Sequence, residues 1–136
     1  MTIKVITFDL DNTLWDVEPA LLRAEDAQRV WLLEHRPGTI EQYDHQALWE
    51  FKKSVWKRFP HFVHNVSAMR HQMLLELQMA AGYEEEKAHE GAKRAFAEFL
   101  AERHRVELYE EALGVLETLA KQYSLGALTN GNADIY

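Results

Sequence analysis

The sequence contains no cysteine among its 136 residues. This absence excludes disulfide bonds, thiolate metal sites and cysteine nucleophiles. It also fits a protein of the reducing cytoplasm, where disulfides are rare. No apolar run approaches the roughly 20 residues that a membrane-spanning helix needs. The first ten residues are too short and too polar for a signal peptide, because Asp9 interrupts their apolar stretch. We therefore expect a cytoplasmic protein with no membrane partner.

Positive charge is scarce as well. The chain has 15 Lys and Arg against 22 Asp and Glu, which gives a formal net charge of -7. Binding to a phosphate backbone requires clustered basic side chains, and the sequence shows no basic stripe. We therefore expect no nucleic-acid partner. A small anionic substrate is compatible with this charge, because a local site can oppose the global field.

Two short apolar runs, residues 3–8 and 124–129, are typical of buried strands in a parallel sheet. A parallel sheet needs both faces covered and normally has more than two strands. The α/β domain is therefore expected to be unfinished at Tyr136. The long block between the two strands is expected to be an insertion with its own core.

Apolar residues recur at helical spacing throughout this inserted block. Four helices are expected there, and a shorter fifth helix over residues 109–122. The second helix is expected to begin at Thr39, because Thr39 and Gln42 have the spacing of a capping box. Three tryptophans of the block are expected in its core, namely Trp31, Trp49 and Trp56.

The strongest chemical signal is the pattern Asp9-x-Asp11-x-Thr13, directly after the first strand. Alternate side chains of an extended segment point the same way, so these three are expected to share one side of the loop. Ligands of open α/β sheets bind beyond the carboxyl ends of the strands. Two close carboxylates favour a hard cation such as Mg²⁺. The alternative is that Asp and Asn residues simply form a turn after the strand.

A second signal, Thr129-Asn130-Gly131, follows the other strand. A hydroxyl and free backbone N–H groups at a strand end suit a phosphate group. Asn-Gly is also an ordinary turn pair, so this signal carries weight only through its position. Both signals lie at the carboxyl ends of strands that would be parallel neighbours.

These two segments resemble the first two motifs of the haloacid dehalogenase-like (HAD) hydrolases. The first is Phe8-Asp9-Leu10-Asp11-Asn12-Thr13-Leu14, and the second is Leu125-Gly126-Ala127-Leu128-Thr129-Asn130-Gly131. The resemblance implies an α/β fold with a Rossmann-like core, of which the first two strands are present, and an inserted all-helical cap of the C1 type. Residues 1–14 and 106–136 would form the partial core, and residues 15–105 the cap.

The resemblance also implies roles for individual residues in a Mg²⁺-dependent phosphatase that acts on small phosphate monoesters. Asp9 would be the nucleophile, and Asp11 the general acid and then the general base. Asp9 by its carboxylate and Asp11 by its backbone carbonyl would contact Mg²⁺. Thr129 and Asn130 would bind the transferring phosphoryl group, and Thr13 would brace the loop.

Asp11 distinguishes reactions within this superfamily. The dehalogenases resemble the pattern at the nucleophile but lack the second Asp, since a leaving halide needs no proton and a leaving alkoxide does. Asp11 therefore favours hydrolysis of phosphate esters. Residues 127–134 with an all-helical cap further resemble bacterial phosphatases that act on flavin mononucleotide or on the phosphorylated ribitylamino-uracil precursor of riboflavin.

The third and fourth family motifs, a Lys or Arg and an acidic pair, follow the second motif, and the chain ends five residues after Gly131. An alternative hypothesis is therefore a truncated, non-catalytic fragment that retains only the phosphate-binding half of the site. A zinc site at His61, His64 and His71 is disfavoured, because these histidines lack the helical i, i+4 pairing of such sites.

Overall fold

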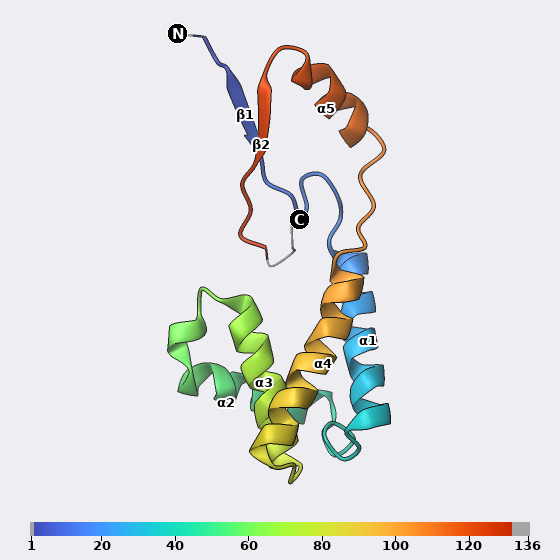
Figure 1. Cartoon of the computed structure of the whole chain (residues 1–136), viewed down its shortest axis with the longest axis vertical. Coiled ribbons are helices and arrows are strands. Elements are labelled where there is room, and N and C mark those ends of the chain that lie inside the picture. The colour runs from blue at the N-terminus through green and yellow to red at the C-terminus, as the bar shows by residue number, and fades with distance from the viewer. Residues whose placement is uncertain (1, 132–136) are drawn as a thin grey trace.

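The computed structural model describes residues 2–131 of the chain. Its elements form two groups that lie one above the other along an elongated molecule (Figure 1). We call β1, β2 and α5 the sheet region, and α1 to α4 with η1 the helical region. In chain order, the elements are β1 (Val5–Phe8), α1 (Glu18–His35), α2 (His45–Arg58), the 3-10 helix η1 (Pro60–Phe62), α3 (Val66–Ala80), α4 (Glu85–Arg103), α5 (Ala112–Ala120) and β2 (Ser124–Ala127).

The two strands pair in parallel, as the sequence predicts. The register runs from Val5 opposite Ser124 to Phe8 opposite Ala127, and α5 contacts β2. Just beyond the strands, the N–H of Leu128 donates to the carbonyl of Phe8 at 2.8 Å. The carboxyl ends of the strands therefore lie side by side, and each continues directly into one of the two motif segments.

The helical region has its own core, which confirms the expected insertion. Helix α4 packs against both α1 and α3. Its small buried residues let the helices approach closely, and the main cluster is formed by Leu32, Leu74, Leu75, Ala88, Ala92 and Ala95. All buried residues of the described chain fall between Ala20 and Arg103. Among residues 2–131, no contact joins an element of one region to an element of the other.

The start of the second helix differs from the prediction. Helix α2 begins at His45, and its N-cap is Asp44, whose side chain accepts the N–H of Ala47 at 2.7 Å. Thr39 is completely buried in the preceding turns instead. Because Pro37 and Gly38 already end α1, the chain needs several further residues to turn before a new helix can begin.

The prediction of three core tryptophans is wrong for two of them. Trp49 and Trp56 are 42% and 48% exposed on α2 and pack edge to face against each other. Trp31 is half-buried beside the main cluster. No helix within residues 2–131 combines the length and hydrophobicity required to cross a bilayer. The end of the motif string, residues 132–134, lies outside the described residues.

Candidate active site

The loop after β1 turns sharply at Asn12. Asn12 has a φ of 59°, and the N–H of Thr13 donates to the carbonyl of Leu10 at 3.0 Å. The expected alternation of Asp9, Asp11 and Thr13 therefore fails at its last member, because alternation requires an extended backbone. Thr13 instead lines a cavity of about 250 Å³ beneath the loop, together with Phe8 and Tyr109.

Asp9 and Asp11 differ in their surroundings. The carboxylate of Asp9 is exposed, and its Oδ1 accepts the neighbouring N–H of Leu10 at 2.9 Å. Asp11 is half-buried, and both of its oxygens are engaged. Oδ1 accepts the indole N–H of Trp15 at 2.9 Å, and Oδ2 accepts an N–H from Nη2 of Arg103. Asp9 is thus the carboxylate that is accessible to a ligand, and Asp11 is the one that is held in place.

The loop after β2 brings the second motif to the same place. The N–H of Gly131 donates to the hydroxyl of Thr129 at 3.0 Å, and Asn130 is exposed. A Cβ atom built on Gly131 would lie 3.1 Å from Oδ2 of Asp11, 3.2 Å from Oγ1 of Thr129 and 3.4 Å from Nη2 of Arg103. Glycine at this position therefore lets a carboxylate, a hydroxyl and a guanidinium converge on one turn.

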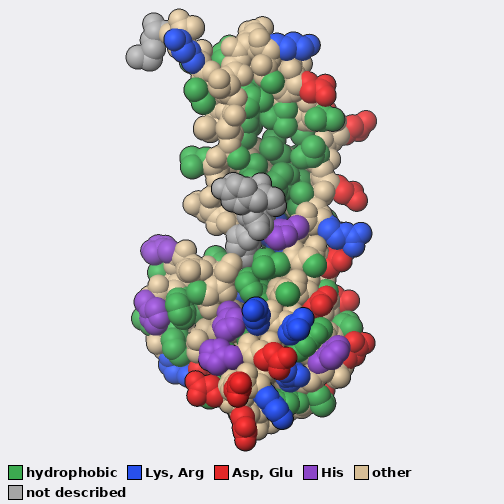
Figure 2. Space-filling model, in the orientation of Figure 1, with side chains coloured by type: hydrophobic (Ala, Val, Ile, Leu, Met, Phe, Trp, Pro, Cys, Tyr) green, Lys and Arg blue, Asp and Glu red, His purple; other side chains and the backbone are tan. Residues whose placement is uncertain are grey.

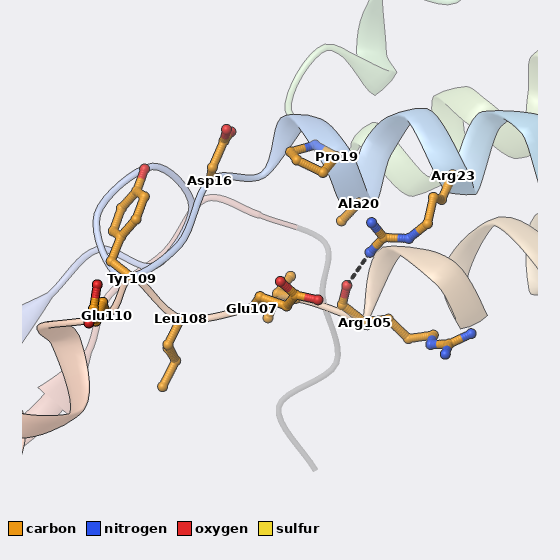
Figure 3. Close-up of a pocket in the computed structure, with 10 residues that line it drawn as sticks. Asp16, Pro19, Ala20, Arg23, Arg105, Glu107, Leu108, Tyr109 and Glu110 are labelled. Carbon is orange, nitrogen blue, oxygen red and sulfur yellow. Dashed lines mark hydrogen bonds between the residues drawn. The ribbon is translucent and has the colours of Figure 1, made fainter.

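The two connections between the regions run side by side and fix the Asp11 loop relative to α4. The N–H of Tyr109 donates to the carbonyl of Leu14 at 2.9 Å, and Trp15 forms an antiparallel bridge with Leu108. Figure 3 shows Arg23 of α1 reaching across to the backbone carbonyl of Arg105. A cavity of about 340 Å³ opens beside these contacts, but none of the predicted site residues lines it.

The oxygen atoms of this site suit a hard cation only in part. Within the described residues, no three Asp, Glu, His or Cys side chains gather around a common metal position. Arg103 occupies Oδ2 of Asp11, which leaves the carboxylate of Asp9 as the available acidic ligand. Mg²⁺ typically keeps several waters and binds one or two carboxylates together with substrate phosphates. A site with the free carboxylate of Asp9 and the backbone carbonyl of Asp11 is compatible with that coordination.

Comparison with known proteins defines the class of protein. The family model described as haloacid dehalogenase-like hydrolase matches residues 3–136. The chain therefore belongs to the haloacid dehalogenase-like hydrolases, and both motif segments fall within the matched range. This confirms the family expected from Phe8–Leu14 and Leu125–Gly131.

Individual relatives narrow the comparison. The chain is 31% identical over 131 residues to the 5-amino-6-(5-phospho-D-ribitylamino)uracil phosphatase YigB of Escherichia coli K12, covering 96% of this chain and 55% of that protein. It resembles the crystal structure of a 2-haloacid dehalogenase from Pseudomonas syringae pv. Tomato with a TM-score of 0.89 and 42% identity. That match covers 98% of this chain and 58% of the other. The chain thus spans somewhat more than half the length of these relatives.

A more distant relative supports the fold alone. A HAD hydrolase from Bacillus subtilis, YfnB, was crystallised bound to magnesium and shows interdomain movement. It aligns with a TM-score of 0.54 and 19% identity, over 96% of this chain and 54% of its own. A mainly helical insertion beside an incomplete Rossmann-like core is consistent with the family match and with both of these solved structures.

Sequence reasoning missed Arg103 as a residue of the site. A signal for it exists, because Arg103 continues the buried face of α4 at helical spacing after Ala92, Ala95 and Phe99. A charged residue on such a face requires a partner. The partner, Asp11, lies 92 residues away in sequence, so only the fold identifies it.

Proposed function

We propose that the protein of which this chain is a part is a Mg²⁺-dependent phosphatase that hydrolyses small phosphate monoesters through an aspartyl-phosphate on Asp9. The observation that carries this proposal is the convergence of Asp11 and Thr129 at Gly131, with the accessible Asp9 two residues before Asp11 in the same loop. The site combines a free carboxylate, a second carboxyl group in a fixed orientation and donors suited to a phosphoryl group. Phosphoryl transfer depends mainly on such positioning and on charge neutralisation.

The reaction follows from these residues in two steps. A carboxylate oxygen of Asp9 attacks phosphorus, and the bond from phosphorus to the ester oxygen breaks as Asp11 donates a proton to the leaving alcohol. Water then attacks phosphorus, Asp11 accepts a proton from that water, and the bond between Asp9 and phosphorus breaks. Thr129, Asn130 and the N–H groups of their turn bind the phosphoryl oxygens in both steps, while Thr13 supports the loop.

A bound Mg²⁺ would neutralise charge on the phosphoryl oxygens. The carboxylate of Asp9 and the backbone carbonyl of Asp11 would be its protein ligands. This assignment is supported by the exposure of the Asp9 carboxylate. The Bacillus relative was itself crystallised bound to magnesium. Residues 1–14 and 106–136 would form the core that holds the ion, and residues 15–105 the cap above it.

The name of the Escherichia coli relative suggests a substrate class. That protein is a phosphatase of a phosphorylated ribitylamino-uracil. We propose a substrate of similar chemistry, either this riboflavin precursor or flavin mononucleotide. Comparing phosphate release from these two compounds with release from simple sugar phosphates tests the assignment, and equal rates on all of them would argue against it.

Dehalogenation is a second candidate, favoured by the name of the Pseudomonas relative at 42% identity. Against it stands Asp11, since a proton donor beside the nucleophile serves an alkoxide leaving group and not a halide. Assaying halide release from a 2-halopropionate beside phosphate release from an aryl phosphate separates the two. Halide release without phosphate release would replace the phosphatase proposal.

The test of the nucleophile uses the full-length product of the gene. We expect Mg²⁺-dependent release of phosphate from an aryl phosphate. Asp9→Asn should abolish it, because the amide is not a nucleophile. Asp26→Asn is the matched control, as Asp26 is exposed on α1 and pairs only with Arg29 among the contacts described. Normal turnover by Asp9→Asn would overturn the mechanism.

The alternative of a non-catalytic fragment concerns residues 1–136 alone. The described part supplies two carboxylates at the site and no group of three metal-binding side chains. We propose that this chain by itself binds Mg²⁺ or phosphate weakly and turns over slowly. Rates for the purified chain equal to those of the full-length product would contradict this proposal.

A further inference from the structure

Arg103 lies in the last turn of α4 in the helical region, yet its side chain ends in the candidate active site. The side chain is only 3% exposed, and Nη2 donates to Oδ2 of Asp11. A buried guanidinium is strongly disfavoured unless it is paired, so this contact accounts for the burial. Within residues 2–131, Nη1 is buried and has no hydrogen-bond partner.

Two donors from different parts of the chain hold the Asp11 carboxylate. Trp15 belongs to the same loop and donates to Oδ1 at 2.9 Å, whereas Arg103 comes from the helical region and donates to Oδ2. A carboxylate that accepts one hydrogen bond on each oxygen has a fixed plane and direction. A group that transfers protons must lie within hydrogen-bond reach of the reacting atom, so its orientation matters directly.

The guanidinium also lies at the phosphate-binding turn. A Cβ on Gly131 would lie 3.4 Å from Nη2 of Arg103 and 3.2 Å from the hydroxyl of Thr129. Because residue 131 is glycine, it places no side chain of its own between the two. The same arginine therefore adjoins the residue expected to transfer protons and the turn expected to bind the phosphoryl group.

We propose that Arg103 is a positioning residue for Asp11, through which the helical region sets the orientation of the proton-transferring carboxyl group. This inference rests on the phosphatase function proposed above. It differs from a purely structural ion pair, because the effect of Arg103 on turnover must act through Asp11. A positioning role also differs from direct binding of the substrate phosphate by Arg103, whose loss would raise KM and leave kcat unchanged.

The first test measures kcat and KM of the full-length product with Arg103→Met and Arg103→Lys. We expect Arg103→Met to lower kcat about 10- to 100-fold with little change in KM, as is typical for residues that orient a functional group. Arg103→Lys should lose less activity than Arg103→Met, since its ammonium group can still donate to Asp11. It should not reach the wild-type rate, because lysine lacks the planar fork of arginine. Arg105→Met is the control, because the Arg105 side chain is 73% exposed.

A double-mutant cycle with Asp11→Asn separates positioning from structure. If Arg103 acts through Asp11, Arg103→Met costs no further activity in the Asp11→Asn background. An equal loss in both backgrounds would overturn the proposal in favour of a structural role, and a raised KM with unchanged kcat would overturn it in favour of phosphate binding. Absence of phosphate release from the wild-type product would instead refute the proposed function.

A second measurement does not depend on activity. The chain contains four tryptophans, and the indole N–H of Trp15 reports on Asp11. In the 136-residue chain, the indole N–H resonance of Trp15, assigned with Trp15→Phe, should shift in Arg103→Lys while the other three stay in place. An unchanged Trp15 resonance in a folded Arg103→Lys variant would overturn the proposal.

Discussion

The helical region and the sheet region differ in how they bury apolar side chains. Every buried residue of the described chain belongs to the helical region or its ends, from Ala20 to Arg103. In the sheet region, by contrast, Val5, Leu113 and Leu128 are 58%, 56% and 73% exposed. Figure 2 shows the same contrast, with apolar side chains gathered on the sheet region and charged ones spread over the helical region.

This difference determines what each region contributes to the candidate site. A two-stranded parallel sheet with one helix leaves apolar faces uncovered, whereas such sheets are normally covered on both faces. Asp9 and Thr129 therefore project from the less stable region, which we expect to open at a lower free energy. Arg103 projects from the well-packed region. Its contact with Asp11 links the loosely packed half of the site to the well-packed one.

The largest effect expected from this comparison comes from the same substitution made in each region. Leu74 is 2% exposed in the main cluster, and Leu113 is 56% exposed on α5. In the 136-residue chain, Leu74→Ala should lower the free energy of unfolding by about 2–5 kcal/mol, because it leaves a cavity. Leu113→Ala should change it by less than about 0.5 kcal/mol. Urea unfolding followed by circular dichroism measures both, and equal costs would show that the regions are equally well packed.

A second, smaller effect uses two helical glycines. A Cβ on Gly91 of α4 would lie 1.9 Å from Oε1 of Gln78, a completely buried side chain that donates to the carbonyl of Leu74. Gly91→Ala should therefore destabilise the chain by about 1–3 kcal/mol, because the buried end of Gln78 must be displaced and its hydrogen bond to Leu74 disturbed.

Gly114 of α5 is the matched control for this change. A Cβ there would meet nothing within 4 Å. Gly114→Ala should stabilise the chain by about 0.5–1 kcal/mol, because alanine loses less backbone entropy in a helix. Thermal unfolding of both variants tests the pair, and stabilisation by Gly91→Ala would contradict the close packing of α3 against α4.

The sequence predicts those features of the fold that depend on residues close together in the chain better than those that depend on distant residues. The parallel pairing of β1 with β2 follows from two apolar runs, and Gly82 has the positive φ that its place after α3 predicts. The prediction that a helix begins at Thr39 is wrong, because capping-box spacing does not distinguish a helix start from a buried turn. The true cap, Asp44, is followed by alanine at the position where that pattern requires Glu or Gln.

In the candidate active site, too, the sequence predicts the local features and misses the contacts between distant residues. Asp9, Asp11 and Thr129 follow from motifs beside strand ends, which are local features. The turn at Asn12, where the extended backbone needed for alternation ends, contains a hydrogen bond from the N–H of Asn12 to the carbonyl of Trp15. The contact of Arg103 with Asp11 joins residues 92 apart. Such contacts arise from the packing of whole helices, which no short pattern encodes.

The smallest expected effect is on the pH dependence of stability, and it arises from a histidine of the helical region. His71 is half-buried on α3, and its ring stacks on that of His89, which in turn lies near Glu85. Burial, and then the neighbouring His89, lower the pKa of His71 from its ordinary value of 6.5. The unfolded chain therefore binds the proton first, and stability falls as the pH drops from 6.5 through the lower folded pKa. His71→Gln should reduce this loss in urea unfolding at several pH values, and His45→Gln at an exposed position is the control variant. The effect is small because water reaches the half-exposed ring, and an unaltered pH dependence in His71→Gln would exclude His71 as its source.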